Sequence, residues 1–159
     1  MSKQIYQRFD GEVAIVMGAP SGIGTATAHR LIDEGAKVLL TDRADAALEK
    51  ILKELPQDRA DIAKADVSKR SEAEAAVAKT VERFGQLDLL ISNAGVSTVG
   101  TLEETDLDDW RSICGTNLDG SIFATKAALP HLKKTRGNIV YTASISGVGG
   151  GKNRFFYGV

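Results

Sequence analysis

The sequence predicts an α/β protein in which a doubly wound parallel sheet is covered by helices on both faces. Short apolar runs alternate with longer amphipathic stretches along the 159 residues, and the connections between the apolar runs are too long for hairpins. Because crossovers between parallel strands are right-handed, the favoured strand order is 3-2-1-4-5. The length fits one domain, which we expect to span residues 1–159.

Each expected element follows from its apolar pattern and from the residue that ends it. The run Val13–Met17 is short, rich in β-branched residues and followed by glycine, as expected of a buried strand. Gly35 ends the first helical pattern. We expect the last helix to bend or break near Gly115 and Gly120, and we identify no final element in residues 143–159. The expected strands are 13–17, 37–41, 60–65, 87–91 and 138–142, and the expected helices are 23–34, 44–55, 68–84 and 107–132.

The composition excludes several kinds of partner. Lys and Arg total 20 and Asp and Glu total 21, so we expect no nucleic-acid partner. No apolar run approaches the ~20 residues of a membrane span, and residues 1–8 lack the apolar core of a signal peptide. We therefore expect a cytoplasmic protein with no membrane partner. Cys114 is the only cysteine, and neither His29 nor His131 has a metal-ligand neighbour, so we expect no metal.

A glycine-rich turn separates the first expected strand from the first expected helix: Gly18-Ala19-Pro20-Ser21-Gly22-Ile23-Gly24. Gly18 permits a tight turn, Gly22 lets the backbone approach a ligand, and Gly24 allows the helix to pack closely on the strand. The helix N-terminus adds free N–H groups and a partial positive charge. A flexible turn without a ligand is the alternative. The strand before the turn and the helix after it favour a site for the pyrophosphate of a dinucleotide, as in a Rossmann fold.

Asp42 and Arg43 end the second expected strand, where the adenosine ribose of a dinucleotide would lie. A carboxylate there accepts hydrogen bonds from the two ribose hydroxyls and repels a 2′-phosphate, so Asp42 favours NAD over NADP. Arg43 offers a cation for a 2′-phosphate, which keeps NADP open. Asp42 as an ordinary loop acid is the alternative without a ligand.

The glycine turn and five further motifs, in the same order along the chain, resemble those of the short-chain dehydrogenase/reductase family, from about residue 10 to the end of the chain. The family's cofactor turn, Thr-Gly-x-x-x-Gly-x-Gly, is matched by residues 17–24, with Met17 lacking the hydroxyl with which the threonine braces the turn. The other matches, in chain order, are Asp66-Val67 for the adenine contact, Ser92-Asn93-Ala94-Gly95 for the Asn-Asn-Ala-Gly motif, Asn117 for the catalytic asparagine, Ser144 for the catalytic serine and Tyr157 for the catalytic tyrosine.

The resemblance implies an NAD(P)-dependent oxidoreductase that moves a hydride between the nicotinamide and a secondary alcohol or ketone. Tyr157 would be the acid/base at the substrate oxygen, Ser144 would orient that oxygen, and Asn117 would anchor a water that carries protons. Each residue has an alternative reading. In these readings Ser144 would only end the fifth strand, the Asn117 side chain would hydrogen-bond within its own helix, and the Tyr157 side chain would only pack against other residues.

The family's tyrosine belongs to a Tyr-x-x-x-Lys motif, and that lysine would fall two residues past Val159. The sixth and seventh strands and the segment that shapes the substrate pocket are also missing, which would leave the fifth strand with an unpaired edge. We therefore expect the sequence to be part of a longer enzyme, which the resemblance implies is a homo-oligomer, a dimer or tetramer. The alternatives are a catalytically silent dinucleotide-binding module or inactive fragment and, disfavoured by the glycine turn and Asp42, a flavodoxin-like FMN domain.

Overall fold

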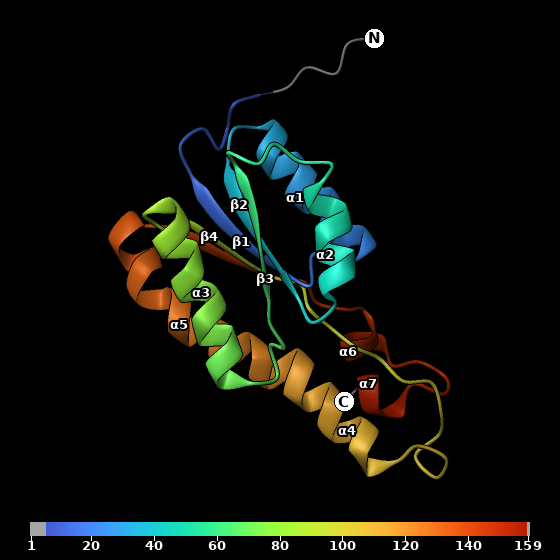
Figure 1. Ribbon diagram of the computed structural model, residues 1–159. Helices are drawn as coiled ribbons and strands as arrows, with labels where there is room; N and C mark the ends of the chain where they lie inside the picture. The colour runs from blue at the N-terminus through green and yellow to red at the C-terminus, as the bar shows by residue number, and fades with distance from the viewer. Residues whose placement is uncertain (1–5, 159) are drawn as a thin grey trace.

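The protein contains one sheet of five parallel strands, and its computed structural model describes residues 6–158. The strands are β1 (Val13–Met17), β2 (Lys37–Asp42), β3 (Ala60–Lys64), β4 (Leu89–Ser92) and β5 (Asn138–Tyr141). Their order is β3-β2-β1-β4-β5, as Figure 1 shows. The predicted fold class and strand order are therefore confirmed.

Helices cover both faces of this sheet (Figure 1). The helices α1 (Gly22–Asp33) and α2 (Asp45–Leu52) pack on one face, and α3 (Arg70–Phe84) and α5 (Gly120–Thr135) pack on the other. Because successive strand residues point to opposite faces, Val16 of β1 lies in the core under α1 and α2, whereas Ile15 lies in the core under α3 and α5. Burial on both faces explains why β1 is apolar along its whole length.

Local hydrogen bonds define both ends of α1. Ser21 is the N-cap, and its Oγ accepts a hydrogen bond of 2.9 Å from the Gly24 amide. At the other end, Gly35 has a φ of 103°, a left-handed conformation that L-residues with a side chain rarely adopt. The glycine that the sequence predicts as the end of this helix is thus confirmed.

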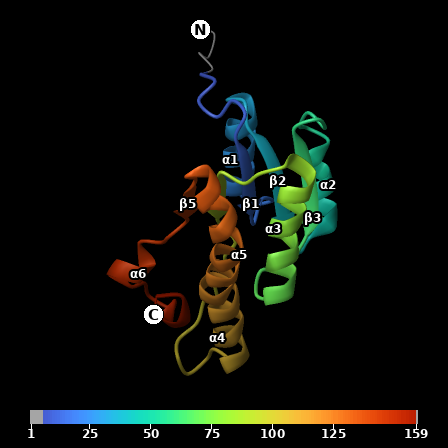
Figure 2. The same cartoon turned by 90° about the vertical axis from the view of Figure 1, so that its left-hand side faces the viewer.

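The predicted long central helix consists of three parts. The helix α4 (Leu107–Ile113) continues into a π-helical turn, η1 (Cys114–Asp119), and then into α5. Figure 2 shows α4 and α5 following one another along one rod. A Cβ on Gly120 would lie 2.9 Å from Cγ2 of Val67, so this helix passes close to the segment after β3. The expected break near Gly115 and Gly120 is the π-helical turn.

The prediction that residues 143–159 form no element was wrong. Two short helices occur there, α6 (Ser146–Gly149) and α7 (Phe155–Gly158). Neither is long enough to show a helical apolar period, and a single turn of helix is marginal unless it packs on the rest of the protein. Phe156 of α7 packs against Trp110 of α4, with ring centroids 5.5 Å apart, and this contact is not visible in the local sequence.

Several element boundaries differ from the prediction. The strand predicted at 87–91 runs from Leu89 to Ser92, and the Oδ2 atom of the preceding Asp88 accepts a hydrogen bond of 2.8 Å from the Val13 amide. The other predicted strands agree with the structure to within one residue, and the predicted helices to within three.

A buried ion pair ties the N-terminal segment to the end of α1. The carboxylate of Glu34 is fully buried and pairs with the guanidinium groups of Arg8 and Arg30. Hydrogen bonds from Arg8 are the main cause that lowers the pKa of Glu34 from the usual 4.5 to about 2, against the opposing effect of burial. The Phe9 amide also donates to the Glu34 carbonyl oxygen at 3.0 Å.

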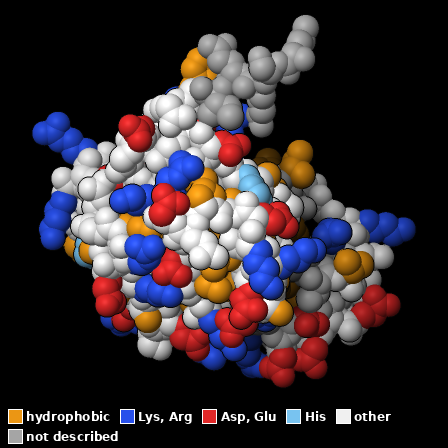
Figure 3. All heavy atoms as spheres, turned by 45° about the horizontal axis from the view of Figure 1, so that its top comes forward, with side chains coloured by type: hydrophobic (Ala, Val, Ile, Leu, Met, Phe, Trp, Pro, Cys, Tyr) orange, Lys and Arg blue, Asp and Glu red, His pale blue; other side chains and the backbone are white. Residues whose placement is uncertain are grey.

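The surface carries both charge signs. Figure 3 shows Lys and Arg side chains interspersed with Asp and Glu side chains on one face of the molecule. Over residues 6–158, none of the helices has both the length and the apolar character needed to span a bilayer. In the same range, His, Cys, Asp and Glu side chains do not gather into a group of three or more that could hold a metal ion.

Candidate active site

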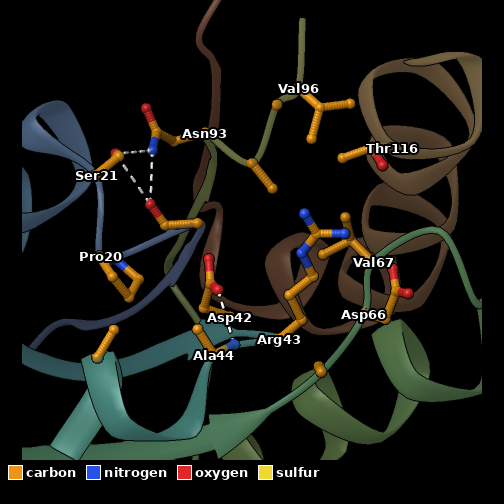
Figure 4. Close-up of a pocket in the computed structure, with 15 residues that line it drawn as sticks. Pro20, Ser21, Asp42, Arg43, Ala44, Asp66, Val67, Asn93, Val96 and Thr116 are labelled. Atoms are coloured by element: carbon orange, nitrogen blue, oxygen red, sulfur yellow. Dashed lines mark hydrogen bonds between the residues drawn. The ribbon is translucent and has the colours of Figure 1, made fainter. Parts of the chain in front are cut away.

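A cavity of about 400 Å³ opens at the carboxyl ends of the parallel strands (Figure 4). This edge is where open α/β sheets bind their ligands. The cavity lies between the glycine turn after β1, the loops after β2 and β3, and the segment after β4. The predicted cofactor-binding residues that line it are Gly18, Ser21, Asp42, Arg43, Asp66, Val67, Asn93, Ala94 and Gly95.

The glycine turn approaches the rest of the fold too closely for other residues. Gly18 has a φ of 75°, and a Cβ there would lie 2.6 Å from the Cα of Ala94. A Cβ on Gly24 would collide with the Gly18 carbonyl oxygen. Around Gly22, by contrast, a Cβ would meet no atom within 4 Å. The open space beside Gly22, at the N-terminus of α1, fits an anionic group such as a pyrophosphate.

Other hydroxyl groups brace the turn in the absence of a threonine at position 17. Met17 is buried in the core. The Thr25 hydroxyl donates to the Ala19 carbonyl oxygen at 2.9 Å, and the Ser21 hydroxyl donates to the Gly18 carbonyl oxygen at 3.1 Å. The turn is therefore braced by Ser21, which lies within it, and by Thr25, which follows it directly.

Asn93 joins this turn to the end of β5. Its Nδ2 donates hydrogen bonds of 2.9 Å to the Gly18 carbonyl oxygen and to Ser21 Oγ. Its Oδ1 accepts a hydrogen bond of 3.1 Å from the Thr142 hydroxyl. Asn93 thus supports the cofactor cavity by fixing the segments around it.

Asp42 and Arg43 face this cavity from the end of β2, as Figure 4 shows. The Oδ1 atom of Asp42 accepts a hydrogen bond of 2.9 Å from the Ala44 amide, which fixes the carboxylate at the cavity. The Arg43 side chain extends across the cavity toward Asp66 and Val67 (Figure 4). An anion and a cation therefore stand side by side where a ribose would bind.

The Asp66 carboxylate is engaged with the loop that follows β3. Its Oδ1 accepts hydrogen bonds from the Ser68 hydroxyl at 2.7 Å and the Ser68 amide at 3.0 Å. These bonds, led by the one from the Ser68 hydroxyl, lower the pKa of Asp66 despite partial burial, and the charges of Lys69 and Arg43 act in the same direction. Asp66 therefore places a negatively charged carboxylate in the wall of the cavity.

A second, larger cavity of about 1070 Å³ adjoins the first. Ser21, Asn93 and the segment 94–96 line both cavities. The second cavity also contains Gly22, Ile23 and all three predicted catalytic residues, Asn117, Ser144 and Tyr157. These three residues come from η1, from the segment after β5 and from α7, so the fold gathers around one space residues that are far apart in the sequence.

The Asn117 side chain bonds to the main chain of another segment. Its Oδ1 accepts a hydrogen bond of 2.8 Å from the Val96 amide, and its Nδ2 donates one of 2.9 Å to the Val96 carbonyl oxygen. Asn117 therefore holds the segment after β4 against the central helix. The alternative in which its side chain bonds within its own helix is not what the structure shows. That Asn117 anchors a water stays a prediction.

Ser144 and Tyr157 lie in two successive short segments. The Oγ atom of Ser144 accepts a hydrogen bond of 3.2 Å from the Ser146 amide at the start of α6. Tyr157 belongs to α7, which follows a glycine-rich connection. Both residues are half-buried and line the wall of the second cavity.

A family model described as short chain dehydrogenase matches residues 12–159. The chain belongs to this family. Among curated relatives, it is 45% identical over 150 residues to the meso-2,3-butanediol dehydrogenase of Serratia marcescens, covering 94% of this chain and 60% of that protein. It is 38% identical over 162 residues to the trans-4-hydroxycyclohexanecarboxylate dehydrogenase of Sinomonas cyclohexanicum, covering 97% of this chain and 62% of that protein. The chain thus spans about three fifths of these relatives.

Solved structures of other short-chain dehydrogenases have the same fold. One from Burkholderia phymatum, in complex with NAD, superposes with a TM-score of 0.90 at 31% identity, covering 94% of this chain and 55% of that chain. One from Brucella melitensis, described as a glucose/ribitol dehydrogenase, superposes with a TM-score of 0.92 at 33% identity, covering 98% of this chain and 66% of that chain.

The second cavity of this short-chain dehydrogenase also contains hydroxyl groups that the sequence analysis did not identify, those of Ser121, Thr125 and Tyr141. Ser92 Oγ lies 3.0 Å from Ser121 Oγ, and Thr125 Oγ1 lies 2.6 Å from the Tyr141 hydroxyl. Ser121 and Thr125 are four residues apart on α5, a spacing that places two side chains on the same face of a helix. That spacing is visible in the sequence and could have identified both residues as facing one surface.

Proposed function

We propose that the protein is an NAD-dependent oxidoreductase that transfers a hydride between the nicotinamide and a secondary alcohol or ketone. One observation carries this proposal: a single cavity connects the glycine turn at Gly22 with Asn117, Ser144 and Tyr157. The names of the relatives from Serratia marcescens and Sinomonas cyclohexanicum, both dehydrogenases of hydroxyl compounds, support the reaction class.

The residues around the first cavity suit a dinucleotide. The pyrophosphate would bind at the N-terminus of α1, where Gly22 leaves open space. Asp42 would accept hydrogen bonds from the ribose hydroxyls, which favours NAD over NADP. Asp66-Val67 would line the adenine side, and Asn93, Ala94 and Gly95 would line the side toward the nicotinamide. The related structure in complex with NAD supports this choice.

The proposed chemistry divides into a hydride transfer and a proton transfer. Bound NAD supplies the hydride acceptor for an alcohol, and its reduced form supplies the donor for a ketone. Tyr157 as the phenolate would accept the proton of the alcohol oxygen, and Tyr157 as the phenol would donate its proton to the carbonyl oxygen in the reverse direction. Ser144 would donate a hydrogen bond to that same oxygen and fix its position. Asn117 would keep the segment at Val96 in place and, as the family resemblance implies, anchor a water for proton exchange.

The direct test is turnover of a panel of secondary alcohols by the complete protein, followed by the absorbance of the reduced cofactor. We expect Tyr157→Phe to lower kcat by about 10²–10⁴-fold while the Kd for NAD stays within about threefold. Tyr6→Phe, at an exposed tyrosine that lines neither cavity, is the matched control. Turnover that survives in Tyr157→Phe would refute the assignment. NAD binding without turnover of any alcohol would instead favour the silent dinucleotide-binding module.

The cofactor preference has its own test. Asp42→Ala removes the carboxylate that would repel a 2′-phosphate, so we expect the ratio of NAD to NADP affinity to fall by about tenfold or more, the size of one lost hydrogen bond to a charged group. Arg43→Ala is the matched control, and it should raise the same ratio. An unchanged ratio in both variants would contradict the proposed ribose site.

We also propose that the protein acts in the cytoplasm as a homo-oligomer, as the family resemblance implies. Three apolar side chains that line neither cavity, Ile145, Val148 and Phe155, are exposed, which supports an additional partner surface. Light scattering of the complete protein tests this proposal, and a monomeric mass at micromolar concentration would refute it.

A further inference from the structure

Tyr157 belongs to α7, a helix too short to keep a fixed orientation without contacts to the rest of the protein. The helix α7 has 4 residues, and so short a helix is unstable in water unless tertiary contacts hold it. The direction in which the Tyr157 side chain points therefore depends on what anchors α7 to the rest of the protein.

Phe156 is the anchor residue of this helix. It is 7% exposed, whereas the neighbouring Phe155 is 47% exposed, and Phe156 is the only buried residue of α7. Its ring lies 5.5 Å from the ring of Trp110, with an angle of 44° between the ring planes. Figure 1 shows α7 beside α4, the helix that carries Trp110.

A second contact fixes the chain just before α7. The Gly100 amide donates a hydrogen bond of 2.7 Å to the Asn153 carbonyl oxygen, and Gly100 pairs with Arg154 as an isolated parallel bridge. The Gly158 amide then donates to the Arg154 carbonyl oxygen at 3.0 Å. Gly100 thus ties the start of α7 to the segment after β4, and the aromatic contact ties α7 to α4.

We propose that Trp110 and Phe156 are positioning residues that orient Tyr157 toward the cavity. Successive helix residues point about 100° apart, so holding Phe156 against Trp110 fixes the direction of Tyr157. Neither Trp110 nor Phe156 lines the cavity, so both act through Tyr157. Trp110 belongs to the helix that continues into η1 and Asn117. The continuous segment of α4 and η1 thereby carries Asn117 and, through Trp110, orients Tyr157. The inference rests on the proposed role of Tyr157.

The test compares four variants of the complete protein: Trp110→Ala, Trp110→Phe, Phe156→Ala and, as the control, Leu107→Ala. Leu107 lies on the same helix as Trp110, is 58% exposed and lines neither cavity. We expect kcat to fall about 10–100-fold in both alanine variants of the aromatic pair, since a displacement of about 1 Å costs about 100-fold. The Kd for NAD, and the amount of NAD bound per chain, should not change. Trp110→Phe, which keeps an aromatic ring, should retain kcat within about fivefold.

Two readouts separate positioning from a general loss of folding. Trp110 is the only tryptophan of the chain, so its fluorescence reports the contact directly: Phe156→Ala should shift the emission to longer wavelength, and Phe155→Ala should shift it less. The pH at which kcat is half-maximal should also move in Phe156→Ala. A kcat that falls only in proportion to the NAD bound per chain, or that equals that of Leu107→Ala, would overturn the inference. Should Phe156→Ala not fold, Phe156→Leu provides the same comparison.

The failure of this inference differs from the failure of the proposed function. If Tyr157→Phe retains turnover, the proposed function is wrong. If Tyr157→Phe abolishes turnover while Trp110→Ala and Phe156→Ala behave like the control, the proposed function stands and the positioning role of the aromatic pair is wrong.

Discussion

The side-chain nitrogen of Asn93 donates a hydrogen bond of 2.9 Å to the carbonyl oxygen of Gly18. Asn93→Ala removes this bond and the one to Ser21 Oγ, and it leaves the Thr142 hydroxyl without its acceptor at Asn93. We expect the free energy of unfolding to fall by about 1–3 kcal/mol and NAD binding to weaken, as measured by chemical denaturation and calorimetry. Asn138→Ala, at an exposed position, is the control, and equal effects in the two variants would contradict the role of Asn93.

Two glycines with similar backbone angles should respond differently to the same substitution. Gly18 has a φ of 75° and Gly85 a φ of 88°, so alanine at either site costs about 1–2 kcal/mol of backbone strain. Only at Gly18 does the added Cβ meet the backbone of Ala94, at 2.6 Å. We therefore expect Gly85→Ala to remain folded and Gly18→Ala to lose several kcal/mol more and to lose NAD binding. Thermal melts and NAD titrations check both, and similar melting temperatures would argue against the clash.

The buried hydroxyl group of Thr41 has no hydrogen-bond partner within the described residues. A buried polar atom without a partner costs about 1–3 kcal/mol, so Thr41→Val should raise the free energy of unfolding by about 1–2 kcal/mol. Thr80 is the matched control, because it is equally buried but donates to the Ala76 carbonyl oxygen at 2.9 Å. Thr80→Val should be neutral or destabilising. A destabilised Thr41→Val would show that its hydroxyl has a partner in solution.

The ion pair of Glu34 makes stability depend on pH in the acid range. The pKa of Glu34 falls from 4.5 to about 2 on folding, chiefly through its hydrogen bonds with Arg8. A lowered folded-state pKa means that the stabilisation is complete above the unfolded-state pKa and is lost as pH falls toward about 2. Urea denaturation of the wild type should show this loss between about pH 4.5 and pH 2. Glu34→Gln should flatten the slope in that window, whereas Glu103→Gln, at an exposed position, should leave it unchanged.

The core of the fold could be predicted because it depends on local patterns. The central strands β1, β2 and β4 are short, largely buried apolar runs, and right-handed crossovers leave few topologies for such a series. The glycine turn was predictable for the same reason, since Gly24 packs against the turn itself and a Cβ there would collide with the Gly18 carbonyl oxygen. The close approach of Gly18 to Ala94 joins distant segments, and the sequence analysis predicted only the tight turn at Gly18.

The rest of the site depends on contacts between distant segments. Asn117 binds Val96 across 21 residues and Asn93 binds Gly18 across 75 residues, and no local pattern predicts either pairing. The helix that carries Tyr157 forms because Phe156 packs on Trp110, so a reading of local periodicity finds no element there. The family motifs identified the positions of these residues, but the structure was needed to show which groups hold them in place.

The sheet is not equally protected across its width. Every residue of β1 is buried, and β1 pairs with β2 on one side and β4 on the other. Within the described residues β5 pairs with β4 alone, and three of its four residues are exposed. Among the described residues, opening of β5 therefore costs less than opening of β1. The turn proposed to hold the cofactor follows β1, whereas Ser144 and Tyr157 follow β5. In the 159-residue chain, mild denaturant should accordingly free the segment that carries Ser144 and Tyr157 at concentrations at which the turn after β1 stays folded.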